Sequence, residues 1–354
     1  MSTAAANSVS TNDDVWQMAE KLVGKPITAL THAASGGNSR IYRVEAGDAV
    51  FALKYYPPAA PAGRDRLGVE IASLKFMGEH GIAGVPRVHG HADRFALYDW
   101  LDGQLPNDIA LADVDGACDF IAHLPRLSRA DGASNFPLAA EACLSLTELI
   151  SQITRRVDRL REVAETEPQL QQFLAGPFAS AWQQRVSAAN ATYANAQSEL
   201  SAAKRCLIPA DFGFHNILKK ADGTLAFIDF EYFGWDDPVK LVADTVLHPG
   251  HALSPACLDR LSQRLNQVFA ADELFTTRLQ AFLPLFSLRW ALILCNEFLP
   301  EKRSNRAFAA AVAESDDAAW ASKKQVQLAK AEAMLSHPAL ALVAELNKTR
   351  PSAA

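Results

Sequence analysis

The chain has 354 residues, of which 49% are hydrophobic and 21% charged, and a formal net charge of −6. These values are typical of a globular protein with a large core, and the length is sufficient for about two domains. The negative charge argues against the basic surface that a nucleic-acid partner requires, and no apolar run approaches the ~20 residues of a membrane helix. We therefore expect neither nucleic acid nor a membrane as a partner.

Residues 1–14 are small and polar, without a basic segment followed by an apolar stretch. This composition predicts a disordered leader and not a signal peptide. The five cysteines lie far apart and lack the paired spacing of a metal site. Scattered thiols of this kind are typical of buried cysteines in a reducing compartment, so we expect a cytoplasmic protein.

The first part of the chain predicts a small sheet. Residues 27–56 contain three apolar segments separated by glycine-containing turns, which indicates three antiparallel strands. A loop at 57–63 precedes residues 64–81, whose apolar residues recur at helical spacing. Residues 85–103 then predict two further short strands. We expect these elements to form an N-terminal lobe over residues 15–103.

From about residue 105 onward, helical spacing of apolar residues dominates, so residues 104–345 predict a mainly helical second lobe. One interruption is clear: Asp222-Gly223 stands between two short apolar runs, and this is the strongest short signal for a β-hairpin. The longest helical patterns cover 140–163, 178–204, 256–270, 276–299 and 317–336.

The segment "PADFGFHN" at 209–216 contains the Asp-Phe-Gly triplet with which protein kinases bind magnesium. That interpretation fails, because the only aspartate near enough upstream to be catalytic, Asp158, lies inside a helical pattern. In the alternative interpretation, Asp211 is the catalytic aspartate, since Asn216 follows it at the spacing of a kinase catalytic loop. Asp229, which follows the predicted hairpin, then takes the place of the metal-binding aspartate.

Taken in order, these motifs resemble the aminoglycoside phosphotransferase and choline kinase-like family. The resemblance covers about residues 27–300 and depends on "SGGNSRIYRV", "FALKYY", Glu70, "DFGFHN" and "IDFEYFGWDDP". It implies an α+β, two-lobed protein-kinase-like fold with a small antiparallel β-sheet N-lobe and a mainly helical C-lobe. It also implies an ATP-dependent phosphotransferase that uses Mg²⁺ and acts on a hydroxyl of a small molecule, such as an amino alcohol, aminoglycoside or sugar-like compound.

The chain departs from the family pattern at one position in this loop. Many relatives have a histidine two residues before the catalytic aspartate, whereas this chain has Pro209, so the usual support of the loop is missing or replaced. His215, next to Asn216, is a common feature of the family loop. A catalytically inactive nucleotide-binding or scaffold pseudokinase is therefore an alternative. A protein kinase is a weaker one, since no Ala-Pro-Glu segment follows Asp229.

The nucleotide site is predicted in the N-lobe. The glycine turn before the second strand can present backbone N–H groups to phosphate, although a plain hairpin turn would explain the same residues. Alternation places Ala52 and Lys54 on one face of a strand, with Lys54 towards the phosphates and Glu70 as its ion-pair partner. The backbone near Asp99 and Trp100 would bind adenine. The predicted nucleotide-binding residues are Gly36, Gly37, Asn38, Ser39, Ala52, Lys54, Glu70, Asp99 and Trp100.

The resemblance implies that Asp211 orients the acceptor hydroxyl and that Asn216 and Asp229 bind Mg²⁺. Turn and strand-end aspartates are common, but the spacing of this pair favours the functional interpretation. Acidic and aromatic residues would suit a cationic acceptor, while a neutral sugar-like alcohol is an equal alternative, because several of these residues are equally compatible with structural roles. The acceptor-pocket candidates are Glu231, Asp236, Asp237, Trp290 and Glu297.

Overall fold

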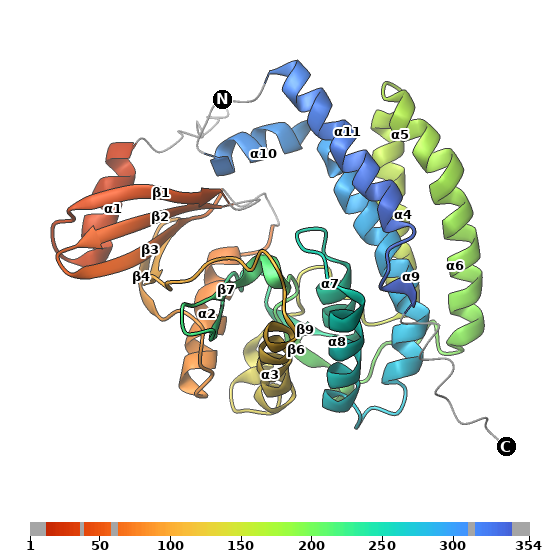
Figure 1. The fold of residues 1–354 in the computed structure, drawn as a ribbon, viewed down its shortest axis with the longest axis horizontal. Coiled ribbons are helices and arrows are strands. Elements are labelled where there is room, and N and C mark those ends of the chain that lie inside the picture. Colours follow the sequence, from red (N-terminus) through yellow and green to blue (C-terminus); the bar gives the residue numbers. More distant parts are fainter. Residues whose placement is uncertain (1–11, 36–38, 58–62, 311–315, 342–354) are drawn as a thin grey trace, which may run out of the picture.

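The computed structural model describes residues 12–35, 39–57, 63–310 and 316–341, which form two lobes (Figure 1). The N-lobe is built on one antiparallel sheet, drawn in red and orange, and the C-lobe is a group of helices. This arrangement confirms the predicted α+β fold with a small sheet and a mainly helical second lobe.

The N-lobe sheet has five strands in the order β1-β2-β3-β5-β4, with every neighbouring pair antiparallel. The prediction of three strands followed by two more is confirmed. The strands are β1 (Ala29–Ser35), β2 (Arg40–Ala46), β3 (Ala49–Tyr55), β4 (Val88–Ala92) and β5 (Phe95–Asp99).

Helix α1 (Asn12–Val23) covers one face of this sheet. Its buried Val15 and Ala19 share a cluster with Leu53 and Tyr55 of β3, which alternation places on one face of that strand. The prediction of a disordered leader is wrong for residues 12–14, which begin this helix. Two of these three residues are aspartates, which stabilise the N-terminal turn of a helix; residues 1–11 lie outside the described chain.

Helix α2 (Arg66–Glu79) packs on the opposite face, as its predicted apolar stripe requires. Asp65 caps the start of the helix, and its side chain accepts a hydrogen bond of 2.9 Å from the N–H of Gly68. Because its buried side chains join the core of the C-lobe, α2 connects the two lobes. These residues are Ile71, Leu74, Phe76 and Met77.

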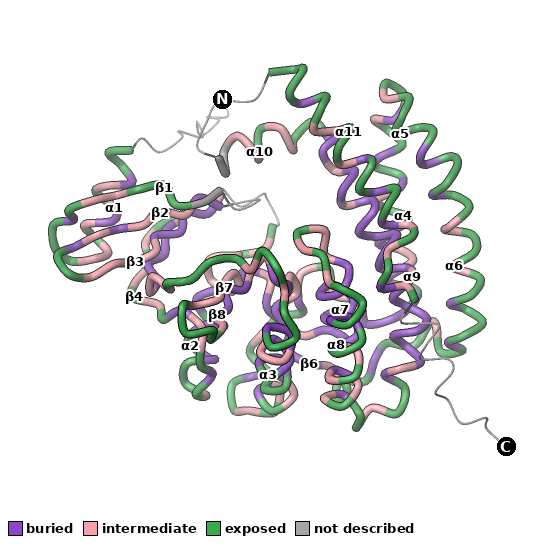
Figure 2. Tube along the Cα trace, viewed as in Figure 1, coloured by how far each residue is buried: buried purple, intermediate pink, exposed green. Residues whose placement is uncertain are grey.

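Helix α9 forms the centre of the C-lobe and contacts α4, α6, α7 and α11. No apolar run of membrane-spanning length was expected, yet residues Phe275–Phe298 are long and apolar enough to cross a membrane. Of their most apolar 18-residue stretch, 83% is buried inside the protein, as in the core helix of a globular protein. Figure 2 shows where buried residues lie along the chain. The C-lobe helices are α3 (Leu111–Leu127), α4 (Leu146–Ala164), α5 (Pro168–Phe173), α6 (Ala179–Thr192), α7 (Pro238–Leu247), α8 (Pro255–Val268), α9 (Phe275–Leu294), α10 (Pro300–Ala310) and α11 (Asp317–Met334).

The predicted helix over 178–204 is too long. Helix α6 ends at Thr192, and Tyr193 has an extended backbone, so the chain leaves the helix and turns towards the next strand. The alanine-rich composition favours a helix throughout, but the run of Asn190, Thr192 and Tyr193 has weak helix propensity. Helices α3, α5, α7 and α10 were not among the predicted long helices.

Two short ribbons complete the C-lobe. The predicted hairpin around Asp222-Gly223 is confirmed, and a second pair of strands joins segments that are distant in sequence. All five cysteines are buried and free, as expected. The ribbon strands are β6 (Cys206–Ile208), which pairs with β9 (Gly234–Asp236), and β7 (Ile217–Lys219), which pairs with β8 (Leu225–Phe227).

Truncation of Leu53 tests the cluster between α1 and the sheet. Leu53→Ala should lower the free energy of unfolding by about 2–5 kcal/mol, because a fully buried side chain is removed and a cavity is left. Urea denaturation measures this change. A matched truncation of the exposed Val326 should change the free energy by less than about 0.5 kcal/mol; equal effects would contradict the packing described here.

Candidate active site

The two ribbons bring the predicted catalytic and metal-binding residues to one edge of the C-lobe. In the β7–β8 hairpin, the pairing of Ile217 with Phe227 continues with a 3.0 Å hydrogen bond from the N–H of Ile228 to the carbonyl of Asn216. Asn216 therefore lies beside Asp229. In the other ribbon, β6 leads directly into the loop that carries Asp211.

Lys54 lies at the centre of a charged cluster. Its Nζ is 2.7 Å from Glu70 Oε2, 2.7 Å from Asp229 Oδ1 and 3.2 Å from Glu231 Oε2. Burial alone would lower the pKa of Lys54, but the carboxylates of Asp229, Glu70 and Glu231 raise it well above its ordinary value. Lys54 is therefore a permanent cation that joins β3, α2 and the segment after β8.

Tyr56 holds Glu70 and is itself in contact with Tyr98, and neither tyrosine was predicted as part of the site. The hydroxyl of Tyr56 donates to Glu70 Oε2 and lies 2.7 Å from the hydroxyl of Tyr98. The N–H of Phe230 donates to Glu70 Oε1 at 3.2 Å. Because Tyr98 pairs with Ala52 across β3 and β5, its side chain lies on the Lys54 face. Strand alternation could have identified Tyr56, which is two residues after Lys54.

The cluster is rich in carboxylate oxygens. Glu70, Asp229 and Glu231 each offer a carboxylate oxygen, and these three atoms lie within 4.8 Å of one another. Burial raises the pKa of Glu231 to about 7. The negative charges of Asp229 and Glu70 add to this increase, whereas the positive charge of Lys54 opposes it. Carboxylate and amide oxygens are the ligands that Mg²⁺ prefers, so the donor set at Asp229 and the neighbouring Asn216 fits that ion.

Asn216 fixes the loop of Asp211. Its side-chain Nδ2 donates to the backbone carbonyl of Asp211 at 3.0 Å, which leaves the amide oxygen available to a ligand. Asp229 and Ala210 both have left-handed backbones, with φ of 67° and 61°. Such conformations cost on the order of 1–3 kcal/mol in residues other than glycine and are concentrated at functional sites.

A group of histidines lies beside Asp211. Nε2 of His215 is 3.4 Å and Nε2 of His248 is 3.7 Å from Asp211 Oδ1. The rings of His215 and His248 stack with centroids 3.5 Å apart, and His251 lies next to them. Of these three, only His215 was predicted from the sequence, because His248 and His251 stand in "LHPGHAL", without a local signal.

Burial keeps two of these imidazoles neutral. It lowers the pKa of His248 to about 2, with smaller contributions from His215 and His251. It also lowers the pKa of His251 to about 4, although the hydrogen bond from Nε2 to the carbonyl of Thr245 acts in the opposite direction. Near neutral pH, His248 is therefore uncharged and does not form an ion pair with the carboxylate of Asp211.

The predicted nucleotide-binding residues are placed as follows. Gly36, Gly37 and Asn38 lie outside the described residues. Ser39 is buried and donates to Glu231 Oε2 at 3.4 Å. The N–H of Asp99 donates to the carbonyl of Arg87 at 3.0 Å and is therefore used within the sheet.

Trp100 follows β5 directly, where the chain leaves the N-lobe. Its indole N–H donates to Asp102 Oδ1 at 3.1 Å, and the guanidinium of Arg43 lies 5.6 Å from the centre of its ring. These contacts hold the side chain on the N-lobe side of the connection between the lobes.

The predicted acceptor residues are buried and already have partners. Glu231 pairs with Lys54, as described above. Asp236 Oδ1 accepts hydrogen bonds of 2.8 Å from the N–H groups of Cys143 and Asp237. Asp237 caps α7 and pairs with Arg278, whose Nε is 2.7 Å from Asp237 Oδ2.

The other two candidates are buried in the same way. The indole of Trp290 donates to Asp244 at 3.1 Å. Glu297 Oε1 accepts from Arg306 at 2.7 Å, and the Glu297 side chain is 4% exposed. All five candidates therefore have partners within the protein, and none of them lines the pocket described next.

A pocket of about 690 Å³ opens between α4, the short helix η5 (Cys295–Phe298) and the segment before α4. Its charged side chains are paired, because Arg155 lies 2.9 Å from Glu148 and Arg156 pairs with Glu141. Amide and hydroxyl groups supply further hydrogen-bonding partners. The lining includes Glu141, Ser145, Gln152, Arg156, Gln197 and Asn296.

Arg64 connects the wall of this pocket to the N-lobe. It precedes α2, and its guanidinium donates to the carbonyls of Leu138, at 2.8 Å, and Phe233, at 2.6 Å. Leu138 lines the pocket, and Phe233 lies between Asp229 and β9. One side chain therefore holds together the start of α2, the pocket wall and the segment that carries the charged cluster.

Protonation of His251 should destabilise the fold in acid. The folded pKa of about 4 lies below the ordinary value of 6.5, so the stabilising contribution is complete above pH 6.5 and is lost as the pH falls towards 4. Between pH 7 and pH 5, the free energy of unfolding from urea denaturation should fall more for the wild type than for His251→Asn. The comparison with the variant is needed because Glu231 and Asp236, with pKa values raised to about 7, change stability in the opposite direction. Equal slopes in the two proteins would contradict this assignment.

Comparisons with known proteins identify the family. The model of the phosphotransferase enzyme family (APH) matches residues 30–275. The ADP-bound aminoglycoside phosphotransferase APH(2'')-Ib has 12% identity and a TM-score of 0.54, over 92% of this chain and 99% of that one. Spectinomycin phosphotransferase APH(9)-Ia, in complex with ADP and spectinomycin, has 11% identity and a TM-score of 0.60, over 90% and 97%.

Choline kinase from Cryptosporidium parvum is similar to the same extent, with 12% identity and a TM-score of 0.53, over 90% of this chain and 93% of that one. A comparison with curated protein sequences gave no match. At these identities, the solved structures show a shared two-lobed protein-kinase-like fold, whereas the family model matches most of the chain. The chain therefore belongs to the phosphotransferase enzyme family.

Proposed function

We propose that the protein is an ATP-dependent phosphotransferase that transfers the γ-phosphoryl group to a hydroxyl of a small molecule. The observation that carries this proposal is the position of Lys54, 2.7 Å from both Glu70 and Asp229. A buried cation between these carboxylates is the arrangement with which kinase-like enzymes orient nucleotide phosphates beside a metal ion. Membership of a phosphotransferase family supports the reaction class, and the ADP in two similar structures supports a nucleotide donor.

In this proposal, Lys54 and Ser39 lie at the phosphates. Ala52 faces the adenine from β3, and the backbone at Asp99 and Trp100 borders it. Glu70 keeps Lys54 in place and does not itself contact the nucleotide. Lys54 can bind phosphate without changing protonation, because its pKa is raised.

Asn216 and Asp229 would hold Mg²⁺, which when bound neutralises charge on the transferred group. The Asp229 side chain is 35% exposed, and only its Oδ1 is engaged by Lys54, so its second oxygen can face a ligand. Asp211 would accept the proton of the acceptor hydroxyl. Its carboxylate is 29% exposed, and the amide of Asn216 fixes the backbone that carries it.

Asp211 does not line the pocket of about 690 Å³, so we assign to this pocket the part of the acceptor remote from the reacting hydroxyl. The charges on its wall are paired, and the acids once assigned to a cationic acceptor have partners inside the lobe. A polar pocket without surplus charge suits a hydroxyl-rich neutral or zwitterionic molecule, such as a sugar or an amino sugar. We further propose that the two lobes divide near residue 103, with α1 in the N-lobe, and that the enzyme acts in the cytoplasm.

Transfer of phosphate from Mg-ATP across a panel of sugars, amino sugars, aminoglycosides and choline tests this function. A phosphorylated product from one of the hydroxyl-rich compounds is the expected result. Phosphorylation of choline alone would contradict the proposed acceptor class. The absence of any product, with nucleotide binding intact, would favour a pseudokinase.

Nucleotide binding is tested separately from turnover. Mg-ATP should raise the melting temperature, because a ligand at 100 times its Kd stabilises the folded state by about 2.7 kcal/mol. EDTA should remove most of this shift, since the metal connects the phosphates to Asp229. A folded protein that shows no shift at millimolar Mg-ATP would contradict a kinase-like site.

The roles of the two aspartates should separate in variants. Asp211→Asn removes the proton acceptor but leaves the metal ligands, so kcat should fall by ~10² to 10⁴ while Mg-ATP still raises the melting temperature. Asp229→Ala removes a metal ligand, so Mg-dependent binding and kcat should both decrease. The opposite pattern, with Mg-dependent binding lost only in Asp211→Asn, would make Asp211 the metal ligand.

A further inference from the structure

The loop that carries Asp211 needs support from outside itself. Pro209 has no backbone N–H to donate, and Ala210 has a left-handed backbone with φ of 61°. An alanine in this conformation is unfavourable unless neighbouring groups stabilise it. Because Ala210 directly precedes Asp211, its backbone sets the direction of the Asp211 side chain.

Lys240 is the buried cation that reaches this loop. It lies in the first turn of α7, and its side chain is 2% exposed. Its Nζ is 3.5 Å from the carbonyl oxygen of Ala210, 2.9 Å from Asp244 Oδ2 and 3.8 Å from Asp236 Oδ2. The ammonium therefore has one carbonyl and two carboxylates around it.

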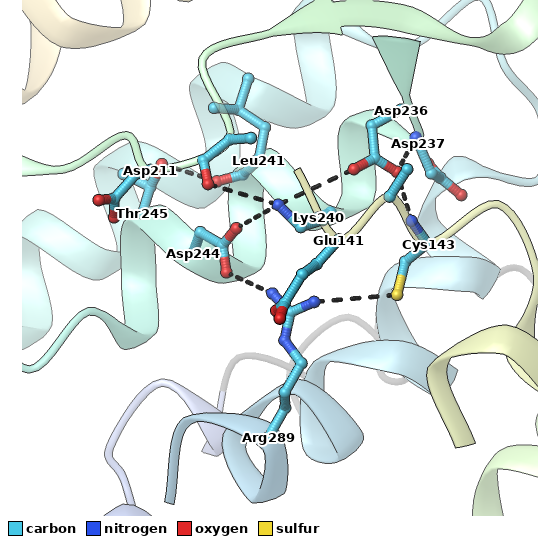
Figure 3. A network of polar contacts seen from close by, with 12 residues as sticks. Glu141, Cys143, Asp211, Asp236, Asp237, Lys240, Leu241, Asp244, Thr245 and Arg289 are labelled. Carbon is cyan, nitrogen blue, oxygen red and sulfur yellow. Dashed lines mark hydrogen bonds and ion pairs between the residues drawn. The ribbon is translucent and has the colours of Figure 1, made fainter. Parts of the chain in front are cut away.

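Figure 3 shows that Lys240 belongs to a larger buried network. Arg289 Nη2 donates to Asp244 Oδ1 at 3.1 Å, and its Nη1 donates to Gln152 Oε1 at 3.1 Å. Gln152, on α4, lines the pocket of about 690 Å³. A continuous series of hydrogen bonds thus runs from the pocket wall through Arg289, Asp244 and Lys240 to the carbonyl of Ala210.

We propose that Lys240 is a positioning residue that supports the catalytic loop, by holding the Ala210 carbonyl and thereby the direction of Asp211. The proposal rests on the proposed function, because that function gives Asp211 its catalytic role. Lys240 touches neither nucleotide nor acceptor in this arrangement. It acts through the backbone of the loop, and its own orientation is fixed by Asp244.

The energetics favour a positioning role over a purely stabilising one. A buried ion pair is often no more stable than apolar residues of the same volume, so its presence is poor evidence for a gain in stability. Burial alone would lower the pKa of Lys240, but Asp244 and Asp236 raise it above its ordinary value. The charged form therefore persists next to the carbonyl of Ala210, where an apolar side chain could not donate a hydrogen bond.

The test combines a single and a charge-balanced variant. Lys240→Met removes the donor, and Lys240→Met/Asp236→Asn removes one positive and one negative charge together, while the asparagine oxygen can still accept from Cys143 and Asp237. Both variants should hydrolyse Mg-ATP, or transfer its phosphate, with a kcat lower by ~10- to 100-fold, because small displacements of a catalytic group have effects of this size. The KM for ATP should stay within about twofold of the wild type, since Lys54 and Asp229 are unchanged.

Two further measurements make the result specific. The amides of residues 210–213 should exchange with solvent faster in both variants, a readout that requires no turnover. Lys324→Met, which breaks the ion pair with Glu167 outside this network, is the matched control and should leave kcat within about twofold.

The proposal is overturned if the charge-balanced variant keeps the wild-type kcat, or if amide exchange at 210–213 is unchanged. If Lys240→Met does not fold, the charge-balanced variant decides. A wild-type enzyme that neither hydrolyses ATP nor transfers phosphate would refute the proposed function, whereas amide exchange would still decide whether Lys240 holds the loop.

Discussion

The ion pairs of Lys54 are the interaction on which the arrangement of the site depends. This one ammonium group contacts carboxylates from α2 and from the segment after β8, while its own backbone belongs to the central strand of the N-lobe sheet. A buried cation requires such partners, because its desolvation is costly. The sheet, α2 and the segment after β8 must therefore lie close enough for their carboxylates to reach Lys54. This approach brings oxygen atoms of Glu70, Asp229 and Glu231 together at one edge of the C-lobe.

The sequence predicts those features that depend on local spacing. Strand alternation places Ala52 and Lys54 on one face, and the interval from Asp211 to Asn216, followed by the hairpin, leads to Asp229. Local spacing does not predict contacts that join distant segments of the chain. Tyr98 reaches Glu70 through strand pairing and Tyr56, and Lys240 reaches Ala210 across 30 residues. The length of α6 was overestimated because alanine content reports helix propensity and not the point at which the chain must turn.

The contacts of the predicted acceptor acids also join distant segments of the chain. Asp236, Asp237 and Glu297 stand near the expected pocket in sequence, but each has a backbone donor or an arginine as its partner in the interior. Composition alone cannot distinguish an acid that faces a ligand from one that balances a buried cation. Among the described residues of the C-lobe, three cations are buried, Lys240, Arg278 and Arg289, and the buried Asp236, Asp237 and Asp244 lie beside them.

The contact of Arg64 with the C-lobe differs in kind from the ion pairs. Its partners are the backbone carbonyls of Leu138 and Phe233, which carry no titratable proton and no net charge. Exposed ion pairs such as Arg155 with Glu148 weaken as salt screens their attraction, whereas a short hydrogen bond to a carbonyl depends far less on ionic strength. The contribution of Arg64 to holding the lobes together should therefore respond less to salt concentration than the exposed ion pairs do, whereas the contribution of Lys54 depends on the charge state of its carboxylate partners.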